Sequence, residues 1–341
     1  MMDTADIETN PFRQDFPLLA AQPDLVFLDS AATAQRPAAV LEAQKHFYET
    51  MNANPLRGLY KLSVEATEEI EKTRAHIARF IGAVDDAGEP QGSEIVFTRN
   101  ATEALNLVAW TLGRTVLHEG DEVVVSIMEH HSNIIPWQQV CAATGATLKY
   151  LRFDDDFRFT EEELENKIGP KTKIVSVTQV SNVLGVENPI ADIAKHAHAV
   201  GAYMVVDGAQ SVPHVKVDVK AMDADLLAFS GHKLGGPMGI GVLWGKAGIL
   251  DKMPPFLTGG EMIDSVTEQA AVWAPVPQKF EAGTQDAAGI YATGAAISYL
   301  EDHDFAALET RERELARYLA EKLEELPFIE MVGPASPDRH I

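Results

Sequence analysis

Short apolar runs rich in β-branched residues alternate with longer segments of helical period along most of the chain. Parallel strands joined by helices give this alternation, because each strand is buried on both faces. The runs predict strands at Glu94–Thr98, Glu122–Ser126, Thr147–Arg152, Lys173–Thr178, Tyr203–Asp207, Leu226–Phe229 and Ile240–Trp244. The segments between and around them predict helices at Glu65–Ile81, Ala101–Leu112, Asn133–Thr144, Ile190–His198 and Phe305–Glu325. We therefore expect an α/β fold with a parallel sheet flanked by helices.

The chain is strongly acidic. Its 341 residues include 51 Asp and Glu against 28 Lys and Arg, which gives a formal net charge of −23 at pH 7. A field of this sign repels the phosphate backbone of nucleic acids. We therefore expect no nucleic acid partner.

The chain shows no signal for a membrane or for secretion. Its first residues are polar and acidic, and no later stretch approaches the ~18 apolar residues that a membrane-spanning helix needs. Cys141 is the one cysteine, which excludes an internal disulfide and suits a reducing compartment. We expect a cytoplasmic protein with no membrane contact.

A lysine and an aspartate follow two predicted strands that are neighbours along the chain. The segment Ser230–Lys233 comes directly after Leu226–Phe229, and Asp207 ends Tyr203–Asp207. Open α/β sheets bind ligands at the carboxyl ends of their strands, where desolvation makes a lysine amine nucleophilic. Each residue alone could instead be a turn residue at the surface. Together they predict an amine that attacks an aldehyde, beside an anion that keeps a pyridinium nitrogen protonated.

The segment 98–103 runs from a strand end into a helix. The free amides and the dipole at such a helix start attract an anion, and Thr102 adds a hydroxyl group. Taken alone, the segment is better explained as an ordinary helix start with Asn100 as its capping residue. Beside the lysine and the aspartate, it predicts a phosphate cradle.

Two adjacent histidines, His130 and His131, follow another predicted strand. Neighbouring residues rarely point at one ion, and no further ligands with suitable spacing are present, so we expect no metal. A ring laid flat against a cofactor is the functional interpretation of His130. A buried histidine held by hydrogen bonds is the structural alternative.

Five segments, taken in order, resemble the fold-type I, class V aminotransferase-like enzymes. The nearest likeness is to SufS-type cysteine desulfurases and selenocysteine lyases, and it runs from about Phe27 to the end of the chain. The resemblance implies a three-layer α/β/α sandwich with a mostly parallel central sheet, a small and here incomplete α+β domain, and pyridoxal 5'-phosphate as cofactor. The segments are Asn100–Glu103, Glu129–Asn133, Ser181–Gly185, Asp207–Gln210 and Ser230–Lys233, with Leu28–Ala32 and Phe280–Thr284 in addition.

The resemblance also implies a role for each site residue. Lys233 would hold the cofactor as a Schiff base and take the substrate α-proton, Asp207 would hold the pyridine nitrogen, and His130 would stack on the ring. Gln210 would contact the phenolic oxygen of the cofactor. The phosphate would be bound by Thr102, Ser230, His232 and the backbone of Ala101, and Thr284 would reach in from a neighbouring subunit. The substrate side would be formed by Asn182, Ala31, Ala32 and Arg57.

The implied activity is that of a cysteine desulfurase. Such an enzyme takes sulfur from L-cysteine, leaves L-alanine and an enzyme-bound persulfide, and passes the sulfur to an acceptor protein for iron–sulfur cluster assembly. We expect a homodimer by the same resemblance. Selenocysteine lyase, with L-selenocysteine as substrate, and another class V aminotransferase or lyase reaction are alternatives. A chain that binds the cofactor without turnover is a third.

The sequence departs from the resembled family in two places. The family's persulfide-carrying cysteine and carboxylate-gripping arginine lie in a C-terminal small domain beyond residue 341, so we expect a truncated chain or a fragment. Cys141 lies among apolar neighbours on a predicted helix, which is typical of an inert core thiol. Leu56 and Tyr60 stand where many relatives carry histidines, which leaves substrate preference open.

We divide the chain into a large cofactor-binding domain, residues 22–290, and a remainder. Residues 1–21 form an N-terminal arm, and residues 291–341 belong to the incomplete small domain. Loops are predicted at Asp251–Gly260 and Ala274–Gln278, because both stretches contain proline or glycine. Long loops in a compact fold often lie at a site or a subunit contact.

Overall fold

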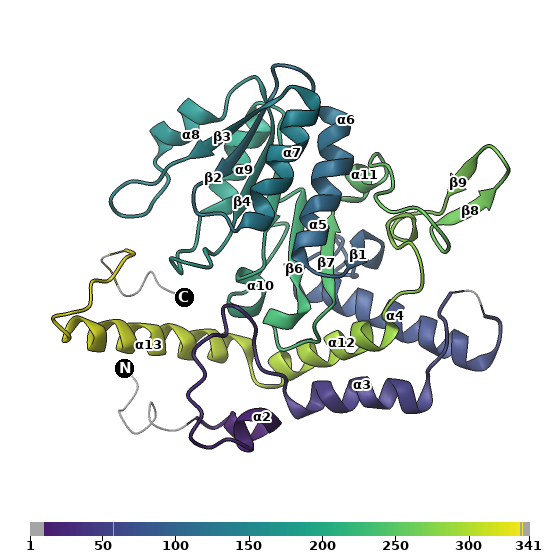
Figure 1. Ribbon diagram of the computed structural model, residues 1–341, viewed down its shortest axis with the longest axis horizontal. Coiled ribbons are helices and arrows are strands. Elements are labelled where there is room, and N and C mark those ends of the chain that lie inside the picture. The colour runs from purple at the N-terminus through teal and green to yellow at the C-terminus, as the bar shows by residue number, and fades with distance from the viewer. Residues whose placement is uncertain (1–9, 57, 335, 337–341) are drawn as a thin grey trace.

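A seven-stranded sheet runs through the centre of the structure, which is a computed structural model describing residues 10–56, 58–334 and 336 (Figure 1). The order across the sheet is β1-β7-β6-β5-β4-β2-β3. All seven strands coincide with predicted ones to within a residue or two. They are β1 (Ile95–Thr98), β2 (Glu122–Ser126), β3 (Thr147–Leu151), β4 (Thr172–Thr178), β5 (Tyr203–Asp207), β6 (Leu226–Ser230) and β7 (Gly241–Gly245).

The sheet is mostly parallel, as predicted. Strands β2 to β6 pair in parallel with one another, whereas β7 runs antiparallel to both β6 and β1. The reversal follows from the length of the β6–β7 connection, residues 231–240. A parallel return needs a crossover of a dozen or more residues, so the chain here can only turn back.

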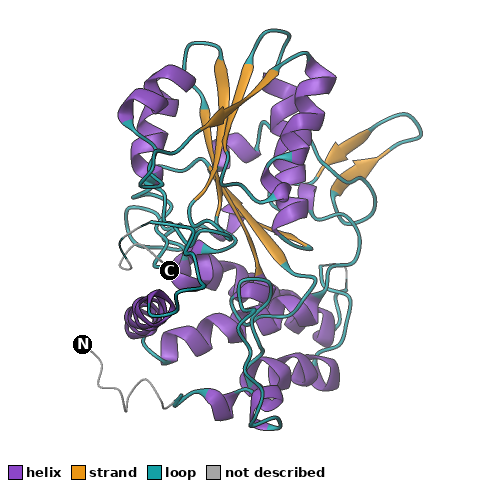
Figure 2. Cartoon of the chain, turned by 60° about the vertical axis from the view of Figure 1, so that its left-hand side comes forward, coloured by secondary structure: helices purple, strands orange, loops and turns teal. Residues whose placement is uncertain are grey.

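Helices cover both faces of the sheet, which confirms the three-layer sandwich (Figure 2). The side chains of β6 alternate between two cores: Leu226 and Ala228 face one, and Leu227 and Phe229 face the other. The first core includes α5 (Ala101–Val108), α7 (Ile135–Thr144) and α11 (Ala247–Leu250), and the second includes α3 (Ala38–Thr50), α4 (Lys61–Phe80), α8 (Glu161–Lys167), α9 (Ile190–Ala199) and α12 (Ala287–Asp302).

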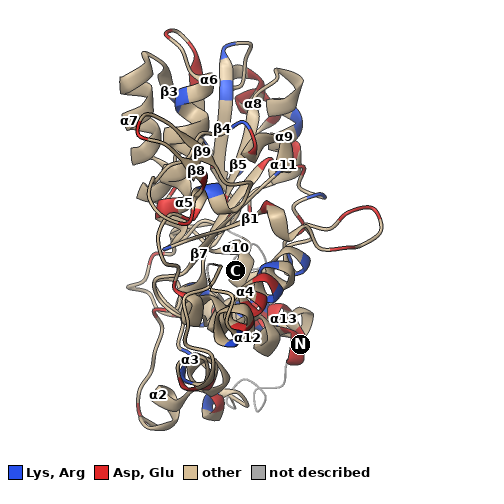
Figure 3. Ribbon diagram, turned by 90° about the vertical axis from the view of Figure 1, so that its right-hand side faces the viewer, with Lys and Arg blue, Asp and Glu red and all other residues tan. Residues whose placement is uncertain are grey.

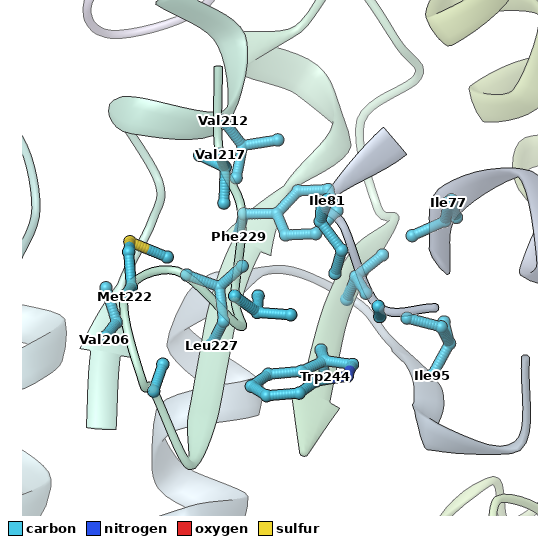
Figure 4. Packing of buried hydrophobic residues seen from close by; sticks show 14 of the residues in the cluster. Ile77, Ile81, Ile95, Val206, Val212, Val217, Met222, Leu227, Phe229 and Trp244 are labelled. Carbon is cyan, nitrogen blue, oxygen red and sulfur yellow. The ribbon is translucent and has the colours of Figure 1, made fainter. Parts of the chain in front are cut away.

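Phe229 lies at the centre of the second core. It packs there with Leu227 and Trp244 from the sheet, with Ile77 from α4 and with Ile81, the residue after that helix (Figure 4). These side chains are almost fully buried. A strand whose two faces both enter a core reads as a continuous apolar run, which is why β6 is plain in the sequence.

The predicted helices are present, with shifted ends. Helix α5 continues through a π-helical turn (Ala109–Gly113) into α6 (Arg114–Val116), and α13 spans Phe305–Glu324. Two long helices, α3 and α12, have no counterpart in the sequence prediction. Helix α12 is buried on most sides and rich in alanine and glycine, so it has no clear polar face for periodicity to detect. The short elements are α2 (Pro17–Ala20), α10 (Ser211–His214) and the 3₁₀ turns Arg13–Asp15, Gly92–Glu94, His131–Asn133, Gly231–Lys233 and Gln278–Phe280.

A hairpin projects from the body between the two predicted loops (Figure 1). Its strands are β8 (Ile263–Val266) and β9 (Ala271–Trp273), which the sequence prediction missed. Both strands are short and largely exposed, so neither gives a buried apolar run. The two predicted loops flank the hairpin. The predicted domain boundary at residue 290 falls within the continuous helix α12, and the division stays a prediction.

An ion pair buried within the fold joins α4 to the segment before α12. The guanidinium of Arg74 donates to both carboxylate oxygens of Glu281 at 2.8 and 3.0 Å, and each side chain is 1% exposed. Arg74 also donates to the carbonyl of Ile95, and Glu281 accepts from the amide of Phe97. The pair therefore fixes β1 and the segment 280–284 to α4.

Acidic residues are spread over the helices and loops around the sheet, including α4 and α13 (Figure 3). Glu161 to Glu163 lie in the first turn of α8, where acids suit the helix dipole, and Thr160 caps that helix.

In the described part of the chain, no helix is both long enough and apolar enough to cross a membrane.

Candidate active site

A cavity of about 550 Å³ lies where β4, β5 and β6 end. It brings together every predicted site residue except Arg57 and Thr284. Its lining residues are Asp29, Ala31, Ala32, Asn100, Ala101, Thr102, His130, Ser132, Thr178, Val180, Asn182, Asp207, Ala209, Gln210, Ser230, His232 and Lys233. The carboxyl ends of parallel strands meet at one edge of the sheet, which is why residues far apart in sequence converge here.

Lys233 lies in the short 3₁₀ turn after β6. Its side chain is half-buried and lines the cavity. Burial lowers the pKa of the Lys233 amine below its ordinary value, while the nearby carboxylate of Asp207 opposes this shift. The amine is therefore neutral, and thus nucleophilic, in a larger fraction of molecules than a surface lysine is.

Asp207 ends β5 and is 3% exposed. Burial raises the pKa of its carboxyl group, while the amide of Ala209, at 2.9 Å from Oδ1, and the charges of Lys233 and His130 oppose the rise. Only one carboxyl oxygen has a hydrogen bond among the described residues. The other is available to a ligand that carries a proton.

Hydroxyl groups and an amide gather where α5 begins. Asn100 caps the helix by accepting from the amide of Glu103 at 2.9 Å, so the capping interpretation of this segment holds. The amide of Ala101 donates to Ser230 Oγ at 2.8 Å, which leaves the hydroxyl proton of Ser230 for a ligand. Thr102 lies one residue further on and lines the same cavity.

His232 is held from the N-terminal segment. Its Nδ1 lies 3.1 Å from Thr33 Oγ1, and its carbonyl accepts from the amide of Ala34 at 3.1 Å. Burial lowers the pKa of this imidazole, and the charges of Lys233 and Arg36 lower it further. The contacts hold the segment that carries Ala31 and Ala32 against the end of β6.

Gln210 is buried beside the same N-terminal segment. Its side-chain amide donates to the carbonyl of Ala31 at 2.8 Å. One N–H of that amide remains for a ligand, which is compatible with the predicted contact with a cofactor oxygen. That contact stays a prediction.

The cavity lacks two predicted residues. Thr284 is exposed and lines a neighbouring cavity of about 450 Å³ together with Arg99 and Glu103. Its predicted reach into another subunit stays a prediction. Arg57 lies outside the described residues.

The comparisons with known proteins agree with this geometry. The family model "Aminotransferase class-V" matches residues 26–341. A probable cysteine desulfurase of Halalkalibacterium halodurans is 51% identical over 310 residues, covering 91% of this chain and 75% of that protein. The chain belongs to the class-V aminotransferase family, among the cysteine desulfurases.

Two solved cysteine desulfurases share the fold of this family member. The apo structure from Thermococcus onnurineus NA1 has a TM-score of 0.90 and 36% identity, covering 100% of this chain and 81% of that one. The structure of CsdA from Escherichia coli has a TM-score of 0.83 and 37% identity, covering 96% and 78%. The expected fold-type I architecture is thereby confirmed.

Pyridoxal phosphate is the cofactor of this family, and the cavity fits it. Its volume lies in the range of small-molecule sites. It combines a half-buried amine, a buried carboxylate with a free oxygen, and the hydroxyl groups of Thr102 and Ser230. Those groups suit an aldehyde, a pyridine nitrogen and a phosphate respectively.

His130 lies over the cavity, and its neighbour His131 does not line it. The two rings are tilted by 48°, with centroids 5.8 Å apart. No group of three or more potential metal ligands occurs in the ranges that the structure describes. Partial burial lowers the pKa of His130, and Asp207 opposes this shift.

Ser132 lines the cavity and Glu129 supports the segment beside it, and the sequence analysis gave neither a role. Glu129 is buried and accepts from Ser126 Oγ, from the amide of Thr178 and from Asn133 Nδ2 at 2.5, 2.9 and 2.6 Å. Burial raises the pKa of its carboxyl group to about 8, against these hydrogen bonds. Glu129 thereby ties the segment that carries His130 to β2 and β4. The signal available in the sequence was the position of Glu129 just after a predicted strand and next to the two histidines.

Cys141 lies inside α7, as predicted for a core thiol. It is 4% exposed, and burial raises its pKa to about 11. A thiol of this pKa is protonated at neutral pH and is a poor nucleophile. It does not line the cavity.

Proposed function

We propose that this chain releases sulfur from L-cysteine and leaves L-alanine, using pyridoxal phosphate bound in the cavity described above. The observation that carries the proposal is the convergence of Lys233, Asp207 and His130 in one cavity with hydroxyl groups at a helix start. The relatives named cysteine desulfurase support the choice of substrate.

The side chains have distinct tasks in this proposal. Lys233 attaches the cofactor covalently and then takes the α-proton of the substrate as a neutral amine. Asp207 holds a proton on the pyridine nitrogen, and His130 covers the ring. The bound cofactor supplies an electron sink for the carbon that loses its proton.

The phosphate is held by polar groups around the start of α5. Ser230 donates its hydroxyl proton, Thr102 and His232 line the cavity beside it, and Ala101 orients Ser230 through its amide. The dipole of α5 adds to the attraction.

The substrate side is assigned to the N-terminal segment and the loop after β4. Ala31 and Ala32 line the cavity with small exposed side chains, and Asn182 is a half-buried amide that faces the substrate carboxylate in this proposal. Arg57 is assigned to the same side from the sequence alone. L-selenocysteine is the alternative substrate, because the same groups accept either side chain.

The test supplies L-cysteine and a small thiol reductant to the protein loaded with pyridoxal phosphate. We expect alanine and sulfide in equal amounts. L-selenocysteine is run in parallel, and a keto-acid acceptor detects amino transfer. New amino acid from the keto acid without sulfide would assign the chain to a transaminase reaction. Bound cofactor that yields neither product would make the chain a binder without turnover.

Cys141 is expected to have no part in sulfur transfer, because its buried thiol stays protonated at neutral pH. Cys141→Ala should release sulfide at the wild-type rate and lose about 1 kcal/mol of stability from the smaller core side chain. Sulfide assays and thermal unfolding measure the two effects. Since Cys141 is the one cysteine in these 341 residues, the added thiol accepts the sulfur in this assay. Loss of sulfide release in a folded Cys141→Ala protein would assign the acceptor role to this residue.

The assembly and its setting are part of the proposal. We propose a SufS-type homodimer in the cytoplasm that passes sulfur to an acceptor protein for iron–sulfur cluster assembly. Leu59, Met238 and Trp273 are exposed apolar side chains of the kind that a subunit contact covers. Light scattering of the purified chain measures the assembly, and a monomer across the micromolar range would contradict it.

A further inference from the structure

A chain of hydrogen bonds runs from the start of α5 to the ring of His130. Thr102 Oγ1 lies 2.7 Å from Ser132 Oγ, and Ser132 Oγ lies 2.9 Å from Nδ1 of His130. The backbone amide of Ser132 also donates to the same Nδ1 at 3.2 Å. Ser132 is 8% exposed, so water competes little for these bonds.

The backbone contact identifies the ring nitrogen that carries no proton in this geometry. An amide N–H can only donate, so Nδ1 of His130 accepts and holds no proton. The ring is also kept neutral, because partial burial lowers its pKa and the charges of Lys233 and His131 add to this, against Asp207. A neutral imidazole with an unprotonated Nδ1 carries its proton on Nε2.

The directions of the other two bonds follow from the first. With Nδ1 as an acceptor, the Ser132 hydroxyl donates its proton to the ring. The oxygen of Ser132 then accepts from the hydroxyl of Thr102. Thr102 therefore orients Ser132, and Ser132 orients the ring.

We propose that Ser132 is a positioning residue that holds His130 as the tautomer protonated on Nε2. Among the described residues, Nε2 has no hydrogen-bond partner, and the ring lines the cavity. His130 thus offers a ligand an N–H donor rather than a base. Removal of the substrate α-proton is then left to Lys233. Only this assignment to Lys233 rests on the proposed function.

The test is a two-bond ¹H–¹⁵N correlation spectrum of protein with ¹⁵N-labelled histidine, which separates protonated from unprotonated ring nitrogens. His130→Asn identifies the resonances of the ring by their disappearance. The spectrum is recorded for the chain alone and for the chain loaded with pyridoxal phosphate. We expect the proton on Nε2 in both. A proton on Nδ1 of His130 in the wild-type chain would overturn the proposal.

Three serine variants test the role of the hydroxyl group. Ser132→Ala loses the hydroxyl contact at 2.9 Å and keeps only the longer amide contact at 3.2 Å. The amide alone holds the ring less firmly, so we expect the ring to turn away from it in part of the molecules and both ring nitrogens to become partly protonated. Ser132→Thr should restore the Nε2 form. An unchanged tautomer in Ser132→Ala refutes the role of the hydroxyl. If Ser132→Ala fails to fold, Ser132→Cys gives the same comparison with a weaker donor.

Ser211→Ala is the matched control. Ser211 is fully buried, and its hydroxyl has no hydrogen-bond partner among the described residues. Its removal should leave the His130 spectrum and the melting temperature unchanged. The spectrum reports the tautomer of His130 without any turnover. A wrong tautomer would therefore overturn this proposal separately from the proposed function, which the release of sulfide tests.

Discussion

Lys233→Ala should lower sulfide release from L-cysteine by at least ~10³-fold, because one amine both attaches the cofactor and takes the α-proton. The variant should also lose the lysine adduct that borohydride fixes, which mass spectrometry of the peptide around residue 233 detects. Lys252→Ala removes an exposed lysine and should change neither readout. A borohydride adduct and full activity in Lys233→Ala would remove the basis of the site assignment.

The same lysine should differ from surface lysines in its pH dependence. Burial lowers the pKa of Lys233, so its neutral fraction rises at lower pH than that of an exposed amine. In the cofactor-free chain, acetylation of Lys233 should therefore begin at a lower pH than acetylation of Lys252. A pH series read by mass spectrometry compares the two residues in one sample, and identical profiles would contradict the predicted shift.

Glu281→Gln should cost about 3–5 kcal/mol of folding stability, because it removes the buried carboxylate that pairs with the guanidinium of Arg74. The carboxylate accepts two bonds from Arg74 and one from the amide of Phe97, and an amide side chain cannot accept all three. Denaturant unfolding of the protein at fixed concentration measures the loss.

Glu71→Gln is the control for this prediction. Glu71 also contacts Arg74, at 3.2 Å, but its side chain is 45% exposed. Exposed ion pairs contribute at most about 1 kcal/mol, because water and salt screen them. Equal losses in Glu71→Gln and Glu281→Gln would show that burial does not set the strength of the Arg74 pair.

Strands and strand-end residues were predictable from sequence because parallel strands are buried on both faces. The run ending in Asp207 and the run before Lys233 are apolar throughout, and each ends in a polar residue at the edge where ligands bind. The ordered motifs then gave the family. Those features are local, so one sequence was enough to find them.

The missed features depend on contacts between distant segments. Helix α12 is buried on most sides and has no polar face that periodicity could detect. The role of Ser132 depends on Thr102, which is distant in sequence and adjacent only in the fold. The contact of Gln210 with the carbonyl of Ala31 likewise joins two residues that are 179 positions apart in the sequence.

The early reversal of the chain after β6 restricts the freedom of its reactive amine. Lys233 lies in a turn whose two arms are both hydrogen-bonded into the sheet, through Ser230 paired with Gly241. Such a tether holds the amine near its target before any ligand arrives, which raises its effective molarity. Inserting glycines into that turn would keep the amine of Lys233 but allow it more positions. The rate of sulfide release should then fall while the chain still folds.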